Sequence, residues 1–433
     1  MARAKKEAAL TPEERLQAAL VPDWEWPYKL PENWCWLKLV ESFDNHTDSK
    51  KKIKQKDYLV KGKLAVVDQG QELIGGYTND VEKSYSGALP IVIFGDHTRC
   101  IKFVDFPFAQ GADGVKVLRP KPFYLPKAFY YALQSVNIPN LGYRRHFPLF
   151  NKFSIPLPPF AEQQRIVDRI ESLFAKLDEA KEKAQAVVDS FETRKAAILH
   201  KAFTGELTAK WRKEHGVGME SWEVRTLDSV CSSIFDGDHM PPPKAESGIP
   251  FLVISNVNTG HLTFENTRFV PQEYYDTLSD TRKPQLGDVL YTLVGSFGIP
   301  VVVNSKRPFC FQRHMALLRP IDVSPQFLWY ILQTPEMYDK ASSIATGTAQ
   351  LTVPIKGLRA MTIPRPNIAE QVEIVRILDG FFAREQSAKE AAEAVLDQIN
   401  LMKKSILARA FRGELGTNDP SEESAVELLK QII

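Results

Sequence analysis

A segment of 54 residues occurs twice in this chain, and no other feature of the sequence restricts its fold as strongly. Residues 155–208 and 363–416 align without a gap at a shift of about 208 positions, and about 25 of the 54 aligned positions are identical. A repeat of this length within one chain indicates an internal duplication. We therefore expect two halves built on one plan.

Both copies predict a long helix. Each begins with prolines, which are tolerated before a helix or in its first turn but not in its interior. Apolar residues then recur alternately three and four residues apart over about five heptads, until Gly205 and Gly413 end the pattern. The predicted apolar seam comprises Ile166, Ile170, Leu173, Leu177 and Phe191 in the first copy and Ile374, Leu378, Phe381, Val395, Ile399 and Ile406 in the second.

A helix of about 42 residues is roughly 60 Å long at 1.5 Å per residue. Two long helices packed inside one core are one interpretation, and an antiparallel coiled coil that separates two globular units is the other. We favour the coiled coil, because no single small domain needs such a length. Each copy also has a polar residue where the other is apolar: Arg194 aligns with Met402, and Glu385 aligns with Leu177. Such breaks can set the register between two helices.

The segments between the repeats predict two globular units. At 433 residues the chain is long enough for two or more domains. Short apolar runs separated by glycine-bearing turns predict strands in both segments, and each segment ends with a short helix. The expected fold class is α+β, with two globular α/β units separated by two long antiparallel coiled-coil helices and a pseudo-two-fold duplication. The expected boundaries are 1–42 for an N-terminal helix and aromatic arm, 43–154 for the first unit, 155–208 for the first long helix, 209–362 for a linker and the second unit, 363–416 for the second long helix, and 417–433 for a C-terminal tail helix.

The N-terminal region combines a helix start with an aromatic arm. Thr11, Pro12 and Glu14 form the pattern of a capping box with proline at the first helical position. Four tryptophans follow, and we expect them to pack the arm against a neighbouring element, with an exposed patch for a partner as the alternative. They are Trp24, Trp26, Trp34 and Trp36.

Charge distinguishes the two globular units. Residues 44–154 contain 13 Lys and 4 Arg against 8 Asp and 2 Glu, a net charge of about +7, whereas residues 219–362 contain 5 Lys and 7 Arg against 8 Asp and 6 Glu, a net charge of about −2. The first unit suits a polyanion. The second would have to bind one through locally placed arginines and amides. The run Lys50–Lys56 is either part of a polyanion surface or a solvated loop.

No motif for catalysis is present. The chain lacks the glycine-rich patterns that hold ATP or a dinucleotide. Leu157 stands where DNA amino-methyltransferases carry a polar residue before Pro-Pro-aromatic, so this site cannot accept hydrogen bonds from a target amino group. Asp236 and His239 lack further ligands at metal-binding spacing. Four widely spaced cysteines and the absence of an apolar run of about 20 residues predict reduced thiols in a cytoplasmic protein.

Several motifs resemble one family, the specificity (S) subunits of type I restriction-modification systems. The resemblance rests on the duplicated helix starts and ends, Ala161-Glu162-Gln163 to Leu207 and Ala369-Glu370-Gln371 to Leu415, and on the N-terminal run LTPEERLQAALVPDWEWPYKLPENW. The segments LGYRRHF, GDVLYTLVGSFG and ATGTAQLTVP are similar to parts of that family's target-recognition domains. The resemblance covers nearly the whole chain.

The resemblance implies a DNA-binding subunit without a catalytic site of its own. It would read a bipartite, asymmetric sequence in double-stranded DNA, with one target-recognition domain for each half-site and the helices setting the gap. Two methyltransferase (M) subunits and the restriction/translocase (R) subunits would bind it. S-adenosylmethionine, ATP and Mg would belong to those partners, with no cofactor or metal in this chain.

We expect the DNA contacts to come from loops of the two globular units. Arginine can bind phosphate or guanine, and glutamine can pair with adenine. The candidates in the first unit are Tyr143, Arg144, Arg145, His146, Arg99, His97 and Lys102. Those in the second unit are Ser296, Gln312, Arg313, His314, Thr346, Thr348 and Gln350.

Three other functions fit the same sequence features. The chain could be the specificity subunit of a related system whose methylase and nuclease share one partner chain. It could instead be a two-headed scaffold that binds proteins, an interpretation supported by the acidic second unit. An enzyme without a recognisable motif is the third, because the members of a catalytic triad can lie far apart in sequence.

Overall fold

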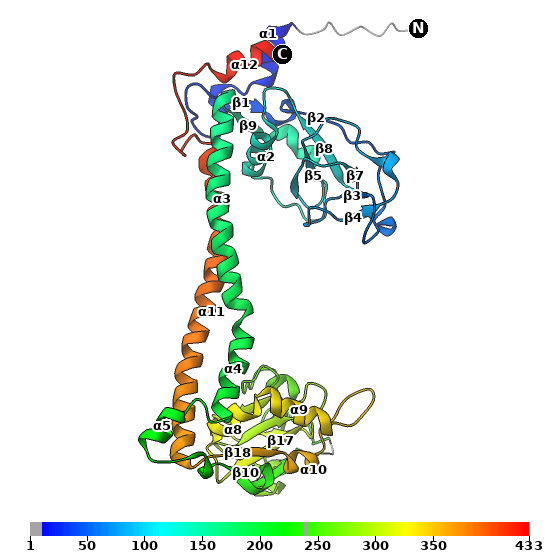
Figure 1. The fold of residues 1–433 in the computed structure, drawn as a ribbon. Coiled ribbons are helices and arrows are strands. Elements are labelled where there is room, and N and C mark those ends of the chain that lie inside the picture. The colour runs from blue at the N-terminus through cyan, green and yellow to red at the C-terminus, as the bar shows by residue number, and fades with distance from the viewer. Residues whose placement is uncertain (1–10, 238, 240, 433) are drawn as a thin grey trace. The chain divides into compact units, whose positions relative to one another are not determined.

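The computed structural model describes residues 11–237, 239 and 241–432, and it divides into two compact units (Figure 1). Unit 1 comprises Met1–Ala184 and Ala394–Ile433, and unit 2 comprises Gln185–Glu393. Residues 1–10, for which we expected an N-terminal segment ahead of the first helix, lie outside the described part. Each unit contains one globular head and parts of the long helices. We call the heads head 1 (residues 43–154) and head 2 (residues 219–362).

Head 1 is built from two small sheets, one α-helix and three short 3-10 helices. The larger sheet is antiparallel, and its strands are ordered β2 (Phe43–Asn45), β8 (Val115–Pro120), β5 (Ile91–Gly95) and β6 (Ile101–Val104). In the smaller sheet β3 (Leu64–Val67) pairs antiparallel with β4 (Gly76–Thr78) and parallel with β7 (Phe108–Gln110). Helix α2 (Pro126–Ser135) buries its apolar face in the core of unit 1. Continuous apolar runs such as Ile91–Phe94 form the buried central strands, as expected for strands covered on both faces.

Head 2 repeats this topology strand for strand. Its larger sheet is ordered β11 (Cys231–Asp236), β17 (Met315–Pro320), β14 (Val289–Thr292) and β15 (Pro300–Val302). In its smaller sheet β12 (Ile249–Leu252) pairs antiparallel with β13 (Arg268–Val270) and parallel with β16 (Cys310–Phe311). Helix α8 (Pro325–Leu332) matches α2, and α6 (Leu227–Val230), α7 (Gln272–Thr277), α9 (Pro335–Ile344) and α10 (Ile355–Ala360) are further helices of head 2. The duplication therefore includes the heads, whose sequences share only a few anchor residues.

A two-stranded sheet joins each head to its long helix. Strand β1 (Cys35–Lys38) pairs with β9 (Ser154–Leu157), and β10 (Glu223–Thr226) pairs with β18 (Thr362–Arg365). Pro156 and Pro364 thus lie in strands β9 and β18, and Pro158, Pro159 and Pro366 lie between these strands and the helices. This corrects the part of the helix prediction that began at residues 155 and 363. The residue before a proline is biased towards extended backbone, and a proline fits at the edge of a short sheet.

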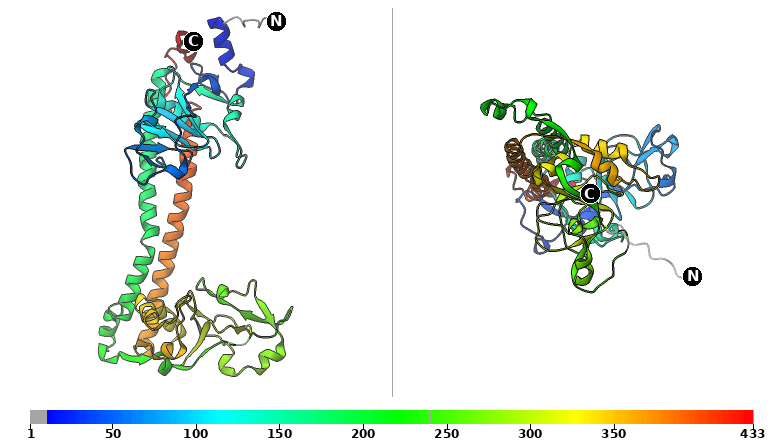
Figure 2. Two further views of the ribbon diagram at one scale, coloured as in Figure 1. Left: turned by 90° about the vertical axis from the view of Figure 1, so that its right-hand side faces the viewer. Right: turned by 90° about the horizontal axis from the view of Figure 1, so that it is seen from below.

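The long helices are antiparallel within each unit (Figures 1 and 2). They are α3 (Phe160–Asp189), α4 (Phe191–Phe203) and α11 (Ile368–Ala410). In unit 1, Ile166 and Ile170 share a core with Leu407 and Ala410. In unit 2, Leu199 and Ala202 share a core with Ile374 and Leu378. Helix α5 (Ala209–Glu214) follows α4, and α12 (Ala425–Ile432) packs on α1 (Pro12–Ala19), whose predicted capping box is present.

The seam predicted for the second repeat is wrong at Val395, while Phe381 and Ile406 are half-buried. Val395 is 41% exposed, whereas Ile374, Leu378 and Ile399 are buried as predicted. The inward positions include two lysines: Lys389 lies 5.0 Å from the ring centroid of Phe191, and Lys403 lies 4.9 Å from that of Phe174. A lysine covers an aromatic ring with its aliphatic stem and its charge. Because these seam positions are lysines, the apolar pattern points to the neighbouring residues instead.

The first long helix is interrupted once, at Ser190. Its backbone has φ −83° and ψ −2°, and its hydroxyl donates a hydrogen bond of 2.5 Å to the carbonyl of Ala186. A serine that bonds back to the preceding turn bends a helix. The next turn carries Arg194, whose guanidinium also donates to the Ser190 hydroxyl. The expected single helix is therefore the pair α3 and α4.

The two polar breaks in the seam are partners. A guanidinium nitrogen of Arg194 lies 2.7 Å from a carboxylate oxygen of Glu385, and the two side chains are 34% and 19% exposed. Arg194→Met is expected to lower the free energy of unfolding by about 1–2 kcal/mol, because it leaves a half-buried carboxylate without its partner. Adding Glu385→Leu should restore most of that loss, since the pair becomes apolar. Urea denaturation followed by circular dichroism measures both changes.

The exposed pair of Lys183 and Glu179 provides the control, because both side chains are more than two-thirds accessible. Lys183→Met should leave the free energy of unfolding nearly unchanged, because solvent screens an exposed ion pair. A double variant no more stable than Arg194→Met alone would show that Arg194 and Glu385 are not coupled.

Candidate nucleic-acid interface

In head 1 the fold brings together the two sequence segments that carry most of the candidate residues. The loop between β5 and β6 meets the loop at 139–146, which precedes the short helix Phe147–Lys152. The contact is made by His146 and Asp96. The backbone N–H of His146 donates to the Asp96 carboxylate over 2.8 Å, and its ring Nδ1 lies 2.8 Å from the Asp96 carbonyl oxygen. Two loops that are about 50 positions apart in the sequence thus lie side by side.

The prediction that His146 contacts DNA is corrected by its burial. The side chain has no exposed surface, and both ring nitrogens are engaged. The N–H of Leu141 donates to Nε2 over 3.1 Å, so the ring proton is at Nδ1 and donates to the Asp96 carbonyl. His146 is therefore the anchor of the loop.

Beyond this anchor, the loop displays an exposed aromatic ring between charged neighbours. Tyr143 is 86% exposed, and its ring stacks on His97 with 4.7 Å between centroids and 12° between planes. Arg144 and Arg145 are exposed beside it. Gly142 has φ 68°, a conformation that side chains disfavour, so the turn requires glycine here. The arrangement offers a flat ring and two guanidiniums to a ligand.

Lys102 and Arg99 differ from these exposed residues. Lys102 is 6% exposed, lies 3.6 Å from the Asp68 carboxylate and donates to the carbonyl of Glu72. Burial lowers its pKa, and the Asp68 carboxylate acts against that shift. The DNA contact predicted for Lys102 is corrected to a structural ion pair. Arg99 is half-buried and donates from Nη1 to the carbonyl of Ile138 over 3.0 Å.

Head 2 forms the same kind of surface from different residues. The loop between β14 and β15 meets the loop at 345–352. The N–H of Gly295 donates to the carbonyl of Leu351 over 3.0 Å, and that of Val353 donates to Leu293 over 2.9 Å. The predicted residues of both loops are exposed. They are Ser296, Thr346, Thr348 and Gln350.

A third loop joins this surface in head 2. The N–H of Leu293 donates to the carbonyl of His314 over 2.8 Å, as that of Asp96 donates to Gly114 over 2.7 Å in head 1. Gln312 is half-buried and Arg313 is exposed. Burial and then the neighbouring charge of Arg313 lower the pKa of His314, which favours a neutral ring that can donate and accept.

Head 2 also contains a stacked pair that sequence reasoning missed. Phe297, in the loop between β14 and β15, stacks on Tyr338 with 5.4 Å between ring centroids and 8° between planes. Tyr338 is 50% exposed. The pair corresponds to His97 and Tyr143 in head 1, because one ring of each comes from the equivalent strand loop. No sequence signal identifies it, since Tyr338 lies on α9 and has no counterpart in a motif.

The Ala-Glu-Gln motif at each helix start is a structural junction. In unit 2, Glu370 has no exposed surface and accepts hydrogen bonds from Arg212 (2.6 Å), Thr208 (2.6 Å) and Trp222 (3.0 Å). Gln371, also buried, accepts a bond of 2.9 Å from the N–H of Ser324 at the start of α8. The glutamate thus binds the segment after the other long helix, while the glutamine binds the head.

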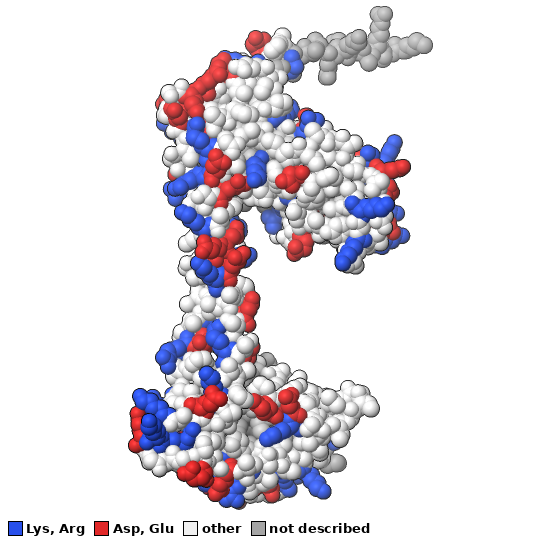
Figure 3. Space-filling view, viewed as in Figure 1, with Lys and Arg blue, Asp and Glu red and all other residues white. Residues whose placement is uncertain are grey.

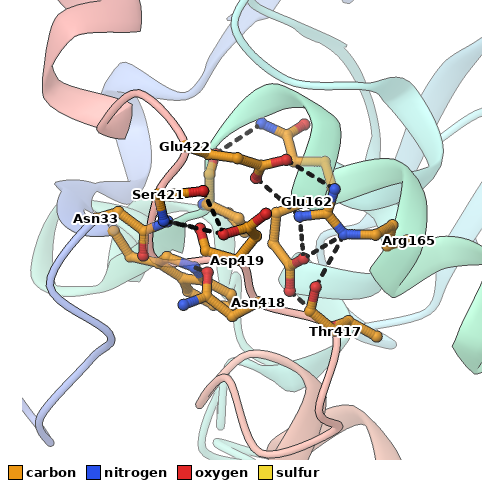
Figure 4. A network of polar contacts seen from close by, with 11 residues as sticks. Asn33, Glu162, Arg165, Thr417, Asn418, Asp419, Ser421 and Glu422 are labelled. Atoms are coloured by element: carbon orange, nitrogen blue, oxygen red, sulfur yellow. Dashed lines mark hydrogen bonds and ion pairs between the residues drawn. The ribbon is translucent and has the colours of Figure 1, made fainter.

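Unit 1 has the matching junction (Figure 4). Glu162 accepts from the hydroxyl of Thr417 over 2.6 Å and from Arg165 over 3.0 Å, and Arg165 also binds Glu422. Burial raises the pKa of Glu162, and the bonds from Thr417 and Arg165 act against that shift. Trp34, buried as expected, donates to Asn418 over 2.9 Å. Trp36 is also buried and Trp26 half-buried, whereas Trp24 is 85% exposed, contrary to the expected packing.

Charged side chains of both signs share the surface of head 1. In the view of Figure 3, lysine and arginine side chains lie over the outer end of head 1, mixed with some acidic ones. Asp236 and His239 form a pair with 2.7 Å between Oδ2 and Nε2. Across the described residues no group of three or more His, Cys, Asp or Glu side chains is arranged to hold a metal ion. Within the same part of the chain, no helix has the length and hydropathy needed to span a bilayer.

Comparison with known proteins agrees with this architecture. Residues 31–188 and 219–396 match the family model for the type I restriction modification DNA specificity domain. The chain is 28% identical over 305 residues to the type I restriction enzyme EcoKI specificity subunit of Escherichia coli K12, covering 65% of this chain and 64% of that protein. It is 24% identical over 373 residues to the EcoR124I/EcoR124II specificity subunit of Escherichia coli, covering 80% of this chain and 86% of that protein.

The fold is also similar to that of solved structures. The crystal structure of the HsdS subunit from Thermoanaerobacter tengcongensis superimposes with a TM-score of 0.57 at 21% identity, covering 90% of this chain and all of that one. A chain from a study of complex assembly in a type I R-M system gives a TM-score of 0.64, also at 21% identity and with the same coverage. The two matched stretches together span more than half of the chain, and each contains one head and the start of the long helix that follows it. The chain therefore belongs to the family of type I restriction modification DNA specificity domains.

Proposed function

We propose that this chain is the DNA-reading subunit of a type I restriction-modification complex, in which each head reads one half of a bipartite, asymmetric site. The observation that carries the proposal is the pair of heads with one topology and different loop residues at the same end of the larger sheet. A common scaffold with different side chains would give two different half-sites, because base identity is read by side chains in the groove.

The exposed loop residues are the proposed DNA contacts. In head 1, Arg144 and Arg145 can donate hydrogen bonds to phosphate or guanine. Tyr143 can contact the flat face of a base or a base methyl group. In head 2, Gln350 suits adenine, while Arg313 and the threonines suit guanine or phosphate. Tyr338 is added to this set because of its stacked and exposed ring.

The chemistry would belong to partner subunits. We propose that two methyltransferase subunits bind the duplicated helices, because a chain with approximate two-fold repetition offers two similar surfaces. Motor-nuclease subunits would complete the complex in the cytoplasm. S-adenosylmethionine, ATP and Mg would be bound by these partners, and the present chain would contribute sequence recognition without a catalytic group.

Co-expression with the methyltransferase encoded beside it tests this proposal. Sequencing of host DNA for modified adenines should reveal one split motif with a fixed, unspecified gap. If a correctly assembled complex modified no DNA, the chain would be better described as a two-headed scaffold for proteins. A neighbouring gene that fuses nuclease and methylase would identify the related system with a single partner chain.

Arg145→Ala is expected to affect only the half-site read by head 1. Loss of one guanidinium contact should weaken binding about 5- to 100-fold or relax one position of that half-site, corresponding to about 1–3 kcal/mol. Binding of the complex to duplexes with single base changes measures both effects. Lys61→Ala, at an exposed position outside the two proposed recognition loops of the same head, is the control. Unchanged affinity and sequence preference would remove Arg145 from the interface.

A further inference from the structure

Each unit has a groove between its head and its long helices. The groove in unit 2 has a volume of about 750 Å³, and the groove in unit 1 has a volume of about 440 Å³. Both are lined by the loop or strand edge after a central strand of the larger sheet and by the end of the short helix of the head. The long helices complete the lining, with α4 and α11 in unit 2 and α11 in unit 1. The grooves are therefore products of the duplication.

The correspondence extends to single residues. Gln333 at the end of α8 and Gln134 near the end of α2 line the two grooves, and these glutamines align between the heads. Each groove receives a lysine from the helices, Lys195 in unit 2 and Lys404 in unit 1. These two lysines do not occupy aligned positions, so the grooves share a charge rather than a copied residue.

Both grooves lack carboxylates in their linings. Much of the unit 2 groove is apolar, because Phe191, Trp329 and Phe382 line it. Its polar side chains come from Lys195, Asn258, Thr259, His261, Gln333 and Gln386, and no aspartate or glutamate lines it. This is notable in head 2, whose net charge is about −2 over residues 219–362.

The unit 1 groove has the same character. Lys404 and Arg99 provide its positive charge, and Gln71, Gln134 and Asn137 provide amides, again without a lining carboxylate. A concave surface with cations, amide donors and no acidic residue is complementary to an anion.

The grooves are continuous with the proposed recognition loops. Arg99 belongs to the loop that carries His97, and Gly298 and Ile299 belong to the loop that carries Ser296. A duplex that touches these loops would extend its backbone past the groove of the same unit. The occupant that fits both the charge and the location is a polyanionic strand of that duplex.

We infer that the two grooves hold the sugar-phosphate backbone of the DNA between the half-sites, with Lys195 and Lys404 as phosphate contacts. This inference rests on the proposed function. A lysine is a compact charge on a flexible stem, which suits a phosphate whose position does not depend on base identity. The grooves would thus add affinity for the unspecified gap without restricting its sequence.

Salt-dependent DNA binding tests the inference. Lys195→Ala, Lys404→Ala and the double variant are compared with the unchanged chain, each purified with the methyltransferase subunits of its own system. Each single change should weaken binding about 3- to 10-fold at moderate salt, equally for sites with different gap sequences. The logarithm of the DNA-binding constant falls linearly with the logarithm of the salt concentration. Each change should make this slope about 1 less negative, because one phosphate contact releases about one counterion.

The matched controls are Lys176→Ala and Lys181→Ala, which change exposed lysines of α3 that line neither groove. They should leave the salt slope unchanged. Lys195→Arg and Lys404→Arg keep the charge and should keep the slope, which separates a phosphate contact from a folding defect. Neutral methylphosphonates in the gap should remove the difference between variant and unchanged chain.

Two results would overturn the inference. One is an unchanged affinity and slope in the double variant while the split site is still recognised. The other is a loss confined to one base pair of a half-site, which would indicate base readout. Failure of the unchanged complex to prefer any split site would instead reject the proposed function, so the two failures are distinguishable.

Discussion

Replacing Glu370 by alanine is expected to lower the free energy of unfolding of unit 2 by about 3–5 kcal/mol, the loss typical of a buried ion pair that loses one partner. The Glu370 carboxylate has no exposed surface, and the side chain of Arg212 is only 8% exposed. Without the carboxylate, a guanidinium remains buried without its counter-charge, and the bonds from Thr208 and Trp222 are lost as well. Thermal and urea denaturation, with tryptophan fluorescence as a probe near Trp222, measure the loss.

Glu373, which lies one helical turn after Glu370, provides a matched control substitution. Glu373 pairs with Arg376, whose side chain is 69% exposed, so Glu373→Ala should cost less than about 0.5 kcal/mol. Glu162→Ala should be intermediate, because Arg165 is 37% exposed and keeps its bonds to Glu422. The pair Glu370→Met with Arg212→Met should be more stable than Glu370→Ala alone. Equal losses for Glu370→Ala and Glu373→Ala would show that burial does not govern the junction.

Lengthening both long helices is expected to lengthen the gap of the DNA site while leaving both half-sites unchanged. Four residues add about 6 Å to a helix at 1.5 Å per residue, and duplex DNA rises about 3.4 Å per base pair. Insertion of four residues after Ala184 and after Glu393, where the two units divide, should therefore increase the gap by one to two base pairs. Sequencing of modified adenines in host DNA gives the new gap directly.

The sharper form of this experiment inserts seven residues. A full heptad keeps the apolar seam in phase, whereas four residues shift it and locally unwind the coiled coil. Seven residues should add about three base pairs with less loss of stability. An insertion of seven residues in α11 alone is the control, because the helices then no longer match in length. Altered half-sites with an unchanged gap would reject the role of the helices as a spacer.

The long helices were predictable because their signal is local and repeated. Residues such as Ile166, Ile170 and Ile374 recur with helical spacing, and they are buried where the pattern places them. The proline segments and the glycines Gly205 and Gly413 limit the pattern without reference to any other part of the chain. The exposure of Val395 was not predictable in this way, and neither were the contacts of Lys389 and Lys403 with aromatic rings on the other long helix.

Within the heads, only the central strands of the larger sheets were predictable from the sequence. Apolar runs identify β5, β14 and the first four residues of β17, which are buried on both faces. The short strands β2, β4 and β13 have three residues each, too few to show a period, and only their pairing partners identify them. The shared topology of the heads was hidden for the same reason, since it is defined by hydrogen bonds between segments that diverge in sequence.

The sequence by itself determined the duplication, the long helices and the family, because these depend on local patterns and on residues that recur at fixed spacing. Only the tertiary structure decided which of the candidate side chains are exposed and which are buried. It buried His146 and Lys102, exposed Tyr143 and Tyr338, and paired Arg194 with Glu385. Exposure and pairing depend on contacts between residues far apart in the chain, and no local pattern records those contacts.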